Sequence, residues 1–286
     1  MALRDEKLAF IGCGTMGEAM VKGLLRNDLV GADQIVVSHP RPDRLRELEE
    51  RYGVGGSTSN SKAALGATLL ALTVKPQVLD EVVSDIEGRV DPGTLVLSIV
   101  AGARMEGLTR RLGTPAVVRV MPNTPAQIGR GISVWTATAE VDDGARTKVR
   151  AVLSALGSEC FVTHEDELDM ATALSGTGPA YVFLFMEALI DAGVHLGFSR
   201  RVASRLVLET VRGSVDFAEI APEHLARLRN QVTSPGGTTA EAHYHLEKGR
   251  LRTVLSDAVW AAYRRCVQLG EQIKPDHDGR PFRGGE

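Results

Sequence analysis

The segment TSPGGTT, residues 233–239, groups small residues whose hydroxyl and backbone N–H groups could bind an anion. Free N–H groups in the first turn of a helix carry partial positive charge, and they bind carboxylate or phosphate without a lysine. Here Gly237, Thr238 and Thr239 would supply the amides, and Ser234 and Thr239 would supply the hydroxyls. An ordinary capped turn between two helices uses the same residue types, so this segment alone leaves both alternatives open.

A helix is predicted to follow this segment directly. Thr238 and Glu241 match the T-x-x-E capping box, in which the Thr caps the helix and the Glu reaches back to the cap residue. The next residues, AEAHYHLEK, favour a helix, and Gly249 is a typical residue just beyond a helix end. On this helix His243 and His245 would point to nearly opposite faces, so we expect no metal site there.

A second candidate site lies near the N-terminus, in FIGCGTMGEAM. Gly12, Gly14 and Gly17 fit the G-x-G-x-x-G pattern directly after an apolar strand and at the opening of a predicted helix. The first glycine permits a tight turn, the second lets amides approach a pyrophosphate, and the third lets the helix pack against the strand. We therefore predict a dinucleotide site that includes Thr15 and Met16, although a simple glycine turn would show the same pattern.

The end of the next predicted strand, VVSHPRPDR, indicates which dinucleotide is bound. An acidic residue at this place would hold the ribose hydroxyls of NADH, but the first acid here is Asp43. Ser38, Arg41 and Arg44 instead offer a hydroxyl and guanidinium groups, which suit the 2′-phosphate of NADPH. NADPH is favoured and NADH remains possible, because both arginines could also lie on the solvated face of the next helix. Which arginine contacts the phosphate stays open.

Three further loops follow predicted strands and would lie at the carboxyl ends of a parallel sheet, where such folds bind ligands. They are TVKPQ with Lys75, SIVAGA with Ala101 and Gly102, and RVMPNTPAQIG with Met121 and Asn123. Lys75 would face the cofactor ribose, take part in proton transfer, or simply be a solvated lysine before a proline.

The distribution of apolar residues predicts an α/β domain followed by a helical one. From residue 7 to about 160, short apolar runs alternate with helical patterns, which implies a Rossmann-type doubly wound, mostly parallel sheet. The expected strands are KLAFIG, QIVVS, TLLALTV, TLVLSIV, AVVRVMP and GISVW, with helices near 16–26 and 42–52. The domains are predicted at 1–163 and 164–273, followed by a loose tail at 274–286 that is rich in Gly, Pro and charge.

The second half contains no run that is credible as a strand. Residues 166–197 are apolar on nearly every face, which is typical of a helix that is buried all round. LSGTGPAY interrupts this helix at a cost of roughly 1 kcal/mol for Gly and roughly 3 kcal/mol for Pro, so close packing of another backbone is expected to offset it. One chain of this size supplies too little cover for such a helix, so we predict an interdigitated homodimer. Further helices are expected after the cap residue Ser199 and from Pro222.

Composition sets limits on other functions. The 286 residues are 43% hydrophobic and 24% charged, as in ordinary soluble proteins, and a net charge of -3 gives no basic field for nucleic acid. The three cysteines are far apart, which indicates a reducing compartment and no metal-ligand spacing. Acids precede the first apolar run, and no run reaches the roughly 18 apolar residues of a membrane span, so we expect a cytoplasmic protein without membrane contact.

Together these motifs resemble the pyrroline-5-carboxylate reductase family, from about Lys7 to Gln272, with SGTGPAY followed by SPGGTT as the most specific part. The resemblance implies a Rossmann domain, a helical dimerisation domain, dimers that often assemble into larger rings, and an active site that involves both subunits. It places the cofactor on Gly12, Gly14, Gly17, Ser38, Asn60, Val74, Lys75 and Ala101, and the substrate carboxylate on Ser234, Gly237, Thr238 and Thr239. The SHPRP turn departs from the shorter S-N-R-like turn of many members.

The reaction that the resemblance implies is the last step of proline biosynthesis, transfer of hydride from C4 of NADPH to the cyclic imine pyrroline-5-carboxylate. An imine is already electrophilic, so the protein need supply mainly orientation. Thr239 is the candidate to hydrogen bond the ring nitrogen and pass a proton from water. One alternative is a reductase of another imine or a hydroxy acid, although the catalytic lysine of the latter is missing near SGTGPAY. Another is a regulatory protein without turnover, which would lack the anion-binding segment.

Overall fold

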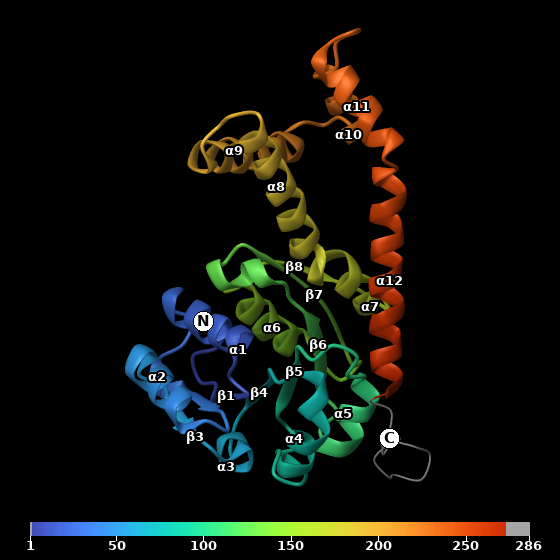
Figure 1. Ribbon diagram of the computed structural model, residues 1–286. Helices are drawn as coiled ribbons and strands as arrows, with labels where there is room; N and C mark the ends of the chain where they lie inside the picture. The colour runs from blue at the N-terminus through green and yellow to red at the C-terminus, as the bar shows by residue number, and fades with distance from the viewer. Residues whose placement is uncertain (1, 273–286) are drawn as a thin grey trace, which may run out of the picture. The chain divides into compact units, whose positions relative to one another are not determined.

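Residues 2–272 are described by a computed structural model, and the tail predicted at 274–286 lies outside them. The chain divides into two units, whose elements are labelled in Figure 1. Unit 1 holds the residues up to Thr177 together with the last helix from Ala262, and unit 2 holds Gly178–Ala261. Each unit is described by itself.

Unit 1 contains one eight-stranded sheet in the order β3-β2-β1-β4-β5-β6-β7-β8. Neighbouring strands are parallel except for β6 and β7, which confirms the predicted mostly parallel sheet. The strands are β1 Leu8–Ile11, β2 Ile35–Ser38, β3 Gly55–Ser57, β4 Leu69–Leu72, β5 Leu95–Ser98, β6 Val117–Met121, β7 Gly131–Ala137 and β8 Gly157–Phe161. Because β1 lies between β2 and β4, the direction of winding reverses there, and such a switch point is where doubly wound sheets bind ligands at the carboxyl ends of the strands.

The structure adds β3 and β8 to the six strands predicted from apolar runs. The sequence of β3 is GGS, and glycine is depleted in strands, so no run marked it. Strand β8, GSECF, pairs with β7 at the edge of the sheet, and its side chains are exposed or half-exposed. Pairing with the neighbouring strand β7, and not a pattern of apolar residues in its own sequence, makes this segment a strand.

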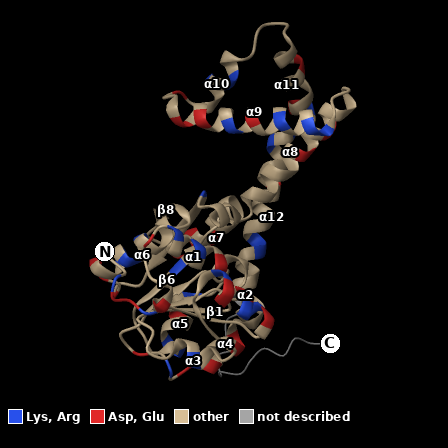
Figure 2. Ribbon diagram, turned by 90° about the vertical axis from the view of Figure 1, so that its left-hand side faces the viewer, with Lys and Arg blue, Asp and Glu red and all other residues tan. Residues whose placement is uncertain are grey.

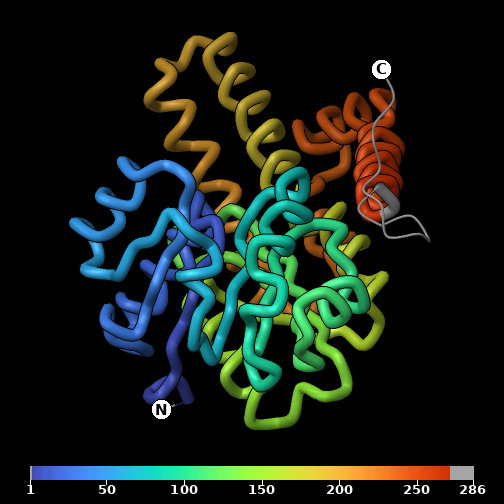
Figure 3. The backbone as a smooth tube through the Cα atoms, turned by 90° about the horizontal axis from the view of Figure 1, so that it is seen from below, coloured from blue at the N-terminus to red at the C-terminus, as the bar shows by residue number. Residues whose placement is uncertain are grey.

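Helices cover both faces of this sheet, and their backbone can be followed in Figure 3. On one face α1, α2 and α6 pack over Phe10 and Trp135, and on the other α3, α4 and α5 pack over Ile11 and Leu72. The α-helices of unit 1 are α1 Thr15–Arg26, α2 Pro42–Tyr52, α3 Asn60–Ala64, α4 Leu79–Ile86, α5 Met105–Leu112, α6 Asp143–Ser154 and α7 Glu167–Ala171. Short 3-10 turns are η1 Ala32–Gln34, η2 Pro76–Val78 and η3 Thr124–Ile128, and η4 Thr172–Gly176 is a π-helical turn. The helices predicted near 16–26 and 42–52 are confirmed as α1 and α2.

Unit 2 is helical, and residues 165–272 contain no strand. Its helices are α8 Gly178–His195, α9 Arg200–Ile220, α10 Leu225–Gln231, α11 Thr238–Lys248 and the first part of α12 Leu251–Gln272. Ser199 caps α9 as predicted, with its side chain accepting from the Val202 N–H. The prediction that Pro222 begins a helix is wrong, because α10 begins at Leu225 after a cap formed by the His224 side chain.

Helix α8 is not buried within this chain, so the cover on all sides that was predicted for it would have to come from the predicted partner subunit. None of its residues is buried, and Phe183 and Leu184 are 60% and 67% exposed. Glu187 and Asp191 are the only Lys, Arg, Asp or Glu residues in α8, and other residues are tan on the ribbon of Figure 2. The stretch Glu167–His195 is long and apolar enough to cross a membrane by length and composition, so the expectation that no run reaches that limit is wrong. Scattered polar residues interrupt the apolar run in this stretch, although its mean hydropathy is high.

Candidate functional site

The glycine loop between β1 and α1 has the geometry that dinucleotide binding requires. Gly12 has φ +81, and a Cβ there would lie 2.1 Å from Val74 Cγ1. A Cβ on Gly17 would lie 2.7 Å from Thr73 Oγ1, so α1 packs closely against the loop that follows β4. A Cβ on Gly14 would meet no nearer protein atom than the Gly12 carbonyl oxygen at 3.8 Å, which leaves room for a ligand. The conformation of Gly12 therefore suits a tight turn, Gly17 allows close packing, and Gly14 leaves open space beside the loop.

The first amides of α1 point away from the helix and carry no side-chain cap. Gly14 is the N-cap without a side-chain hydrogen bond, and the helical ladder starts with the Glu18 N–H donating to the Gly14 carbonyl at 2.9 Å. The N–H groups of Thr15 and Met16 precede that ladder. At the positive end of the helix dipole, these amides suit a pyrophosphate.

Ser38 holds the glycine loop from the end of β2. Its carbonyl accepts from the N–H groups of Gly12 and Cys13 at 3.1 and 2.9 Å, and its hydroxyl accepts from the Gly12 N–H at 3.2 Å. The same hydroxyl donates to Asn60 Oδ1 at 2.8 Å, and Asn60 Nδ2 donates to Asp85. The Ser38 hydroxyl donates its one proton to Asn60, so its oxygen is left to accept from the Gly12 N–H. Both Ser38 and Asn60 therefore support the glycine loop.

Arg41 and Arg44 have different surroundings, which bears on the choice left open by the sequence. The Arg44 side chain is 14% exposed and pairs with Glu18 and with Glu47, the latter at 2.9 Å. The Arg41 side chain is 64% exposed, and its ion pair with Asp43 is long, at 4.0 Å. Arg41 is therefore the guanidinium available to a ligand at the end of β2.

A cluster of hydrogen bonds neutralises Glu18 in the first turn of α1. Burial raises the pKa of this carboxyl, but hydrogen bonds from Arg44, Tyr52 and Arg51 outweigh burial and leave the pKa below its usual value. The Arg51 and Tyr52 bonds measure 2.7 and 2.8 Å. A bare carboxylate in this turn would repel the pyrophosphate, so the two arginines preserve the electrostatic character of the helix start.

Two predicted cofactor residues and one predicted loop follow β4 and β5. Val74 packs against Gly12, and the exposed Lys75 precedes the turn η2. Lys75 forms no ion pair with any residue between 2 and 272. Ala101 and Gly102 lie in the loop between β5 and α5. These residues lie at the same edge of the sheet as the glycine loop, as predicted for parallel strands.

The loop after β6 contacts Ser175 and Gly176, which begin the segment SGTGP and lie in unit 1. Asn123 Nδ2 donates to the Ser175 carbonyl at 3.2 Å, and Asn123 Oδ1 accepts from the Ile132 N–H at 3.0 Å. A Cβ on Gly176 would be in ordinary contact with Met121 Sδ at 3.5 Å, so tight backbone packing does not explain this glycine within the chain. The interruption is instead the π-helical turn η4, and such turns occur frequently at functional sites.

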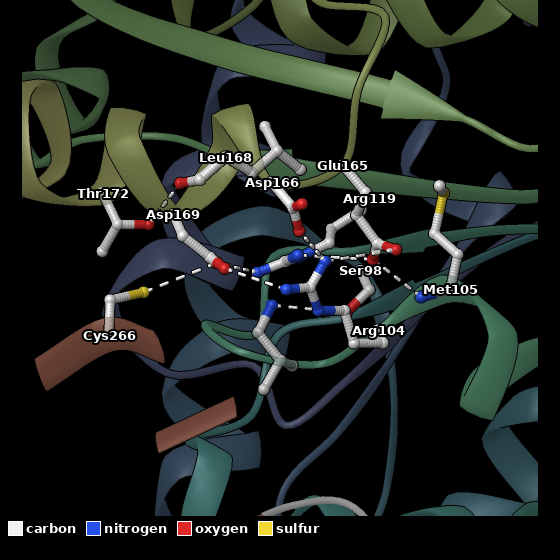
Figure 4. Close-up of polar contacts among 11 residues, drawn as sticks. Ser98, Arg104, Met105, Arg119, Glu165, Asp166, Leu168, Asp169, Thr172 and Cys266 are labelled. Carbon is white, nitrogen blue, oxygen red and sulfur yellow. Dashed lines mark hydrogen bonds and ion pairs between the residues drawn. The ribbon is translucent and has the colours of Figure 1, made fainter. Parts of the chain in front are cut away.

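A buried ion cluster that the sequence did not predict fixes α7 and α12 to the sheet (Figure 4). Arg119 on β6 is 1% exposed and donates to Asp169 at 2.7 Å, while Glu165 lies 3.3 Å away. Arg104 also binds Asp169, at 3.3 Å, and the Cys266 thiol on α12 donates to the same carboxylate at 3.6 Å. The signal in the sequence was a single arginine inside the apolar strand AVVRVMP. Such a residue needs a buried acid, but the sequence does not say which one.

The predicted anion-binding segment lies in unit 2, at the start of the eleven-residue helix α11. Gly236 has φ +67, and Gly237 is the N-cap without a side-chain hydrogen bond. The predicted capping box is therefore wrong, since Thr238 is the first residue of the helix and not its cap. The consequence favours anion binding, because the Thr238 and Thr239 N–H groups precede the helical ladder and no side chain caps them. Ser234 is exposed in the single chain beside them.

A doubly wound sheet with this glycine loop, followed by a helical unit, defines the class of dinucleotide-binding oxidoreductases. Residues 7–102 match the family model for NADP oxidoreductase, coenzyme F420-dependent, and residues 165–269 match the model for pyrroline-5-carboxylate reductase dimerisation. The pyrroline-5-carboxylate reductase of Synechocystis sp. is 39% identical over 93% of this chain and 99% of its own length. The pyrroline-5-carboxylate reductase of Escherichia coli is 35% identical over 94% of this chain and 98% of its own length. The chain belongs to the pyrroline-5-carboxylate reductase family.

Solved structures of the same family agree with this assignment. The Plasmodium falciparum pyrroline carboxylate reductase with NADP bound is 31% identical, with a TM-score of 0.85 over 93% of this chain and 98% of that one. The pyrroline-5-carboxylate reductase of Coxiella burnetii is 34% identical, with a TM-score of 0.83 over 92% and 98%. The predicted fold, a Rossmann-type sheet followed by a helical dimerisation domain, is confirmed.

Proposed function

We propose that this protein reduces 1-pyrroline-5-carboxylate to L-proline with NADPH, the last step of proline biosynthesis. The observation that carries the proposal is 39% identity to a pyrroline-5-carboxylate reductase along nearly the whole of both chains. A structural relative that binds NADP supports the cofactor, and the absence of an acid between Ser38 and Asp43 favours NADPH over NADH. Hydride adds to the imine carbon, the C=N π electrons move to nitrogen, and the nitrogen takes a proton.

The test is the loss of NADPH absorbance when pyrroline-5-carboxylate is added to the purified protein, repeated with NADH. Proline that accumulates in proportion to the NADPH consumed supports the proposal. No cofactor oxidation with either dinucleotide would overturn it. Buffer without protein is the control, because the substrate and the cofactor both decay in solution.

The site is proposed to combine residues of both domains, taken as 1–163 and 164–273. The cofactor would contact Gly12, Gly14, Thr15, Met16, Gly17, Ser38, Arg41, Asn60, Val74, Lys75 and Ala101. The substrate carboxylate would bind the amides of Gly237, Thr238 and Thr239 and the hydroxyl of Ser234. The uncapped start of α11 supports this assignment, because a small carboxylate needs several N–H donors at one place.

Thr239→Ala is expected to lower the rate of proline formation at least tenfold, about 1.4 kcal/mol in the transition state. The Thr239 hydroxyl is proposed to hydrogen bond the ring nitrogen and pass it a proton from water. The measurement is kcat with saturating substrate, alongside NADPH affinity, which should not change because Thr239 is assigned to the substrate and not to the cofactor. An unchanged kcat would remove Thr239 from the mechanism.

The working molecule is proposed to be a cytoplasmic homodimer, with a larger ring of dimers as the alternative assembly. The exposed apolar helix α8 and the match of residues 165–269 to a dimerisation model support this reading over a membrane span. No partner nucleic acid or membrane is proposed. Sedimentation at micromolar concentration, without detergent, should give at least a dimer, and a monomer would contradict the proposal.

A further inference from the structure

His39 stands at the end of β2, next to the residue that supports the glycine loop. Its backbone N–H donates to the Ser57 carbonyl at 3.2 Å, which fixes the chain as it leaves the sheet. Its ring nitrogen Nδ1 accepts from the Arg41 N–H at 3.1 Å, and the ring is half-buried. Arg41 is also the N-cap of α2, so the imidazole orders the short turn that connects β2 to that helix.

This bond gives His39 the geometry of an Asx turn, in which a side chain accepts from the N–H two residues later. An accepting Nδ1 carries no proton, so in the neutral ring the proton lies on Nε2. Burial lowers the pKa of His39, as do the positive charges of Arg41 and Arg44, and these outweigh the Arg41 backbone bond and the charge of Asp43. The folded-state pKa lies below the ordinary value, so the ring stays neutral at neutral pH and gains charge only on acidification.

We propose that His39 is a specificity-determining residue, whose neutral ring supplies an Nε2–H donor beside the Arg41 guanidinium for the 2′-phosphate of NADPH. The inference rests on the proposed function. The end of the second strand is where dinucleotide enzymes distinguish a ribose hydroxyl from a phosphate, and an acidic side chain there selects NADH. In this chain the same place carries the His39 ring and the exposed Arg41 guanidinium, whose ion pair with Asp43 is long at 4.0 Å, whereas Arg44 is held by Glu18 and Glu47.

The decisive variant is His39→Asp. An aspartate preserves the acceptor for the Arg41 N–H, because aspartate forms Asx turns, but it replaces the donor with a carboxylate. The ratio of kcat/KM for NADPH to kcat/KM for NADH is expected to fall at least tenfold. A role confined to ordering the turn predicts a different pattern, because the turn carries Arg41: His39→Ala, which loses the acceptor, would lower the ratio, whereas His39→Asp, which keeps the acceptor, would lower it less.

Two further variants complete the test. Arg41→Ala is the positive control, and its ratio should also fall, because it removes the neighbouring guanidinium. His39→Ala, which loses the donor without gaining a negative charge, should lower the ratio at least threefold, and it serves if His39→Asp does not fold. An unchanged ratio in a folded His39 variant, judged by its thermal unfolding midpoint, would overturn the inference. A wild-type protein that turns over neither cofactor would instead refute the proposed function, and direct titration of both dinucleotides without substrate would still decide the role of His39.

Discussion

An Asp169→Asn variant is expected to lose about 3–5 kcal/mol of unfolding free energy, because breaking a buried ion pair leaves an uncompensated charge. Asp169 and Arg119 are 4% and 1% exposed, and their atoms lie 2.7 Å apart. Arg119 Nε has no hydrogen-bond partner among residues 2–272, so the guanidinium has little with which to replace the lost carboxylate. The remaining acid, Glu165, is 3.3 Å away and more exposed.

The measurement is urea unfolding at one fixed protein concentration, since association of subunits adds to apparent stability. Asp166→Asn is the matched control, because Asp166 pairs with Arg104 but is 69% exposed. An exposed pair contributes roughly 0–1 kcal/mol, so this variant should lose less than about 1 kcal/mol. Equal losses in the two variants would show that burial of the Arg119 pair is not what stabilises α7. Replacing Arg119 and Asp169 together by Met and Leu should recover much of the loss, because both charges then disappear.

The features that could be predicted from the sequence are those that local residue patterns determine. Gly12, Gly14 and Gly17 follow an apolar strand, and each of the three has the conformation or the contact that its place in the pattern requires. Central strands such as β4 are buried on both faces, so they read as continuous apolar runs. The order of the strands then follows from the usual winding of such chains.

The features that could not be predicted depend on residues far apart in the chain. Arg119 and Asp169 are joined only after β6 and α7 have been placed, and nothing in their neighbouring residues announces the pair. The Thr238 capping box failed for a different reason. Gly237 precedes it and takes the cap position itself, so the helix starts one residue earlier than the T-x-x-E pattern suggests.

Burial of α8 was predicted from composition and is absent from the single chain. An apolar helix sequence indicates that the helix is covered in the working molecule, but it does not indicate which chain covers it. Phe183 and Leu184 remain largely exposed here, which is the pattern expected of a subunit interface. The sequence analysis had already judged one chain too small to supply this cover, so the exposure agrees with the predicted homodimer, which stays a prediction.

Gly12→Ala is expected to raise the KM for NADPH at least about 30-fold, equivalent to about 2 kcal/mol, and to lower stability as well. The residue has φ +81, and strained backbone of this kind costs on the order of 1–3 kcal/mol in a residue with a side chain. The new Cβ would lie 2.1 Å from Val74 Cγ1 and 3.2 Å from Val74 Cα, so rotation of the valine side chain relieves only part of the overlap. The glycine loop must then move away from β4, and the amides of α1 with it.

Gly14→Ala separates ligand binding from folding. Gly14 has φ -80 and ψ -155, which an alanine adopts, and the nearest protein atom to the new Cβ is 3.8 Å away. The folded protein should therefore tolerate the change, with an unfolding free energy within about 1 kcal/mol of the wild type. The Cβ would nevertheless enter the space that this glycine leaves for the pyrophosphate, so NADPH affinity should fall at least tenfold. The measurement is titration of NADPH into the folded variant. An affinity equal to that of the wild type would show that the pyrophosphate does not approach the loop at Gly14.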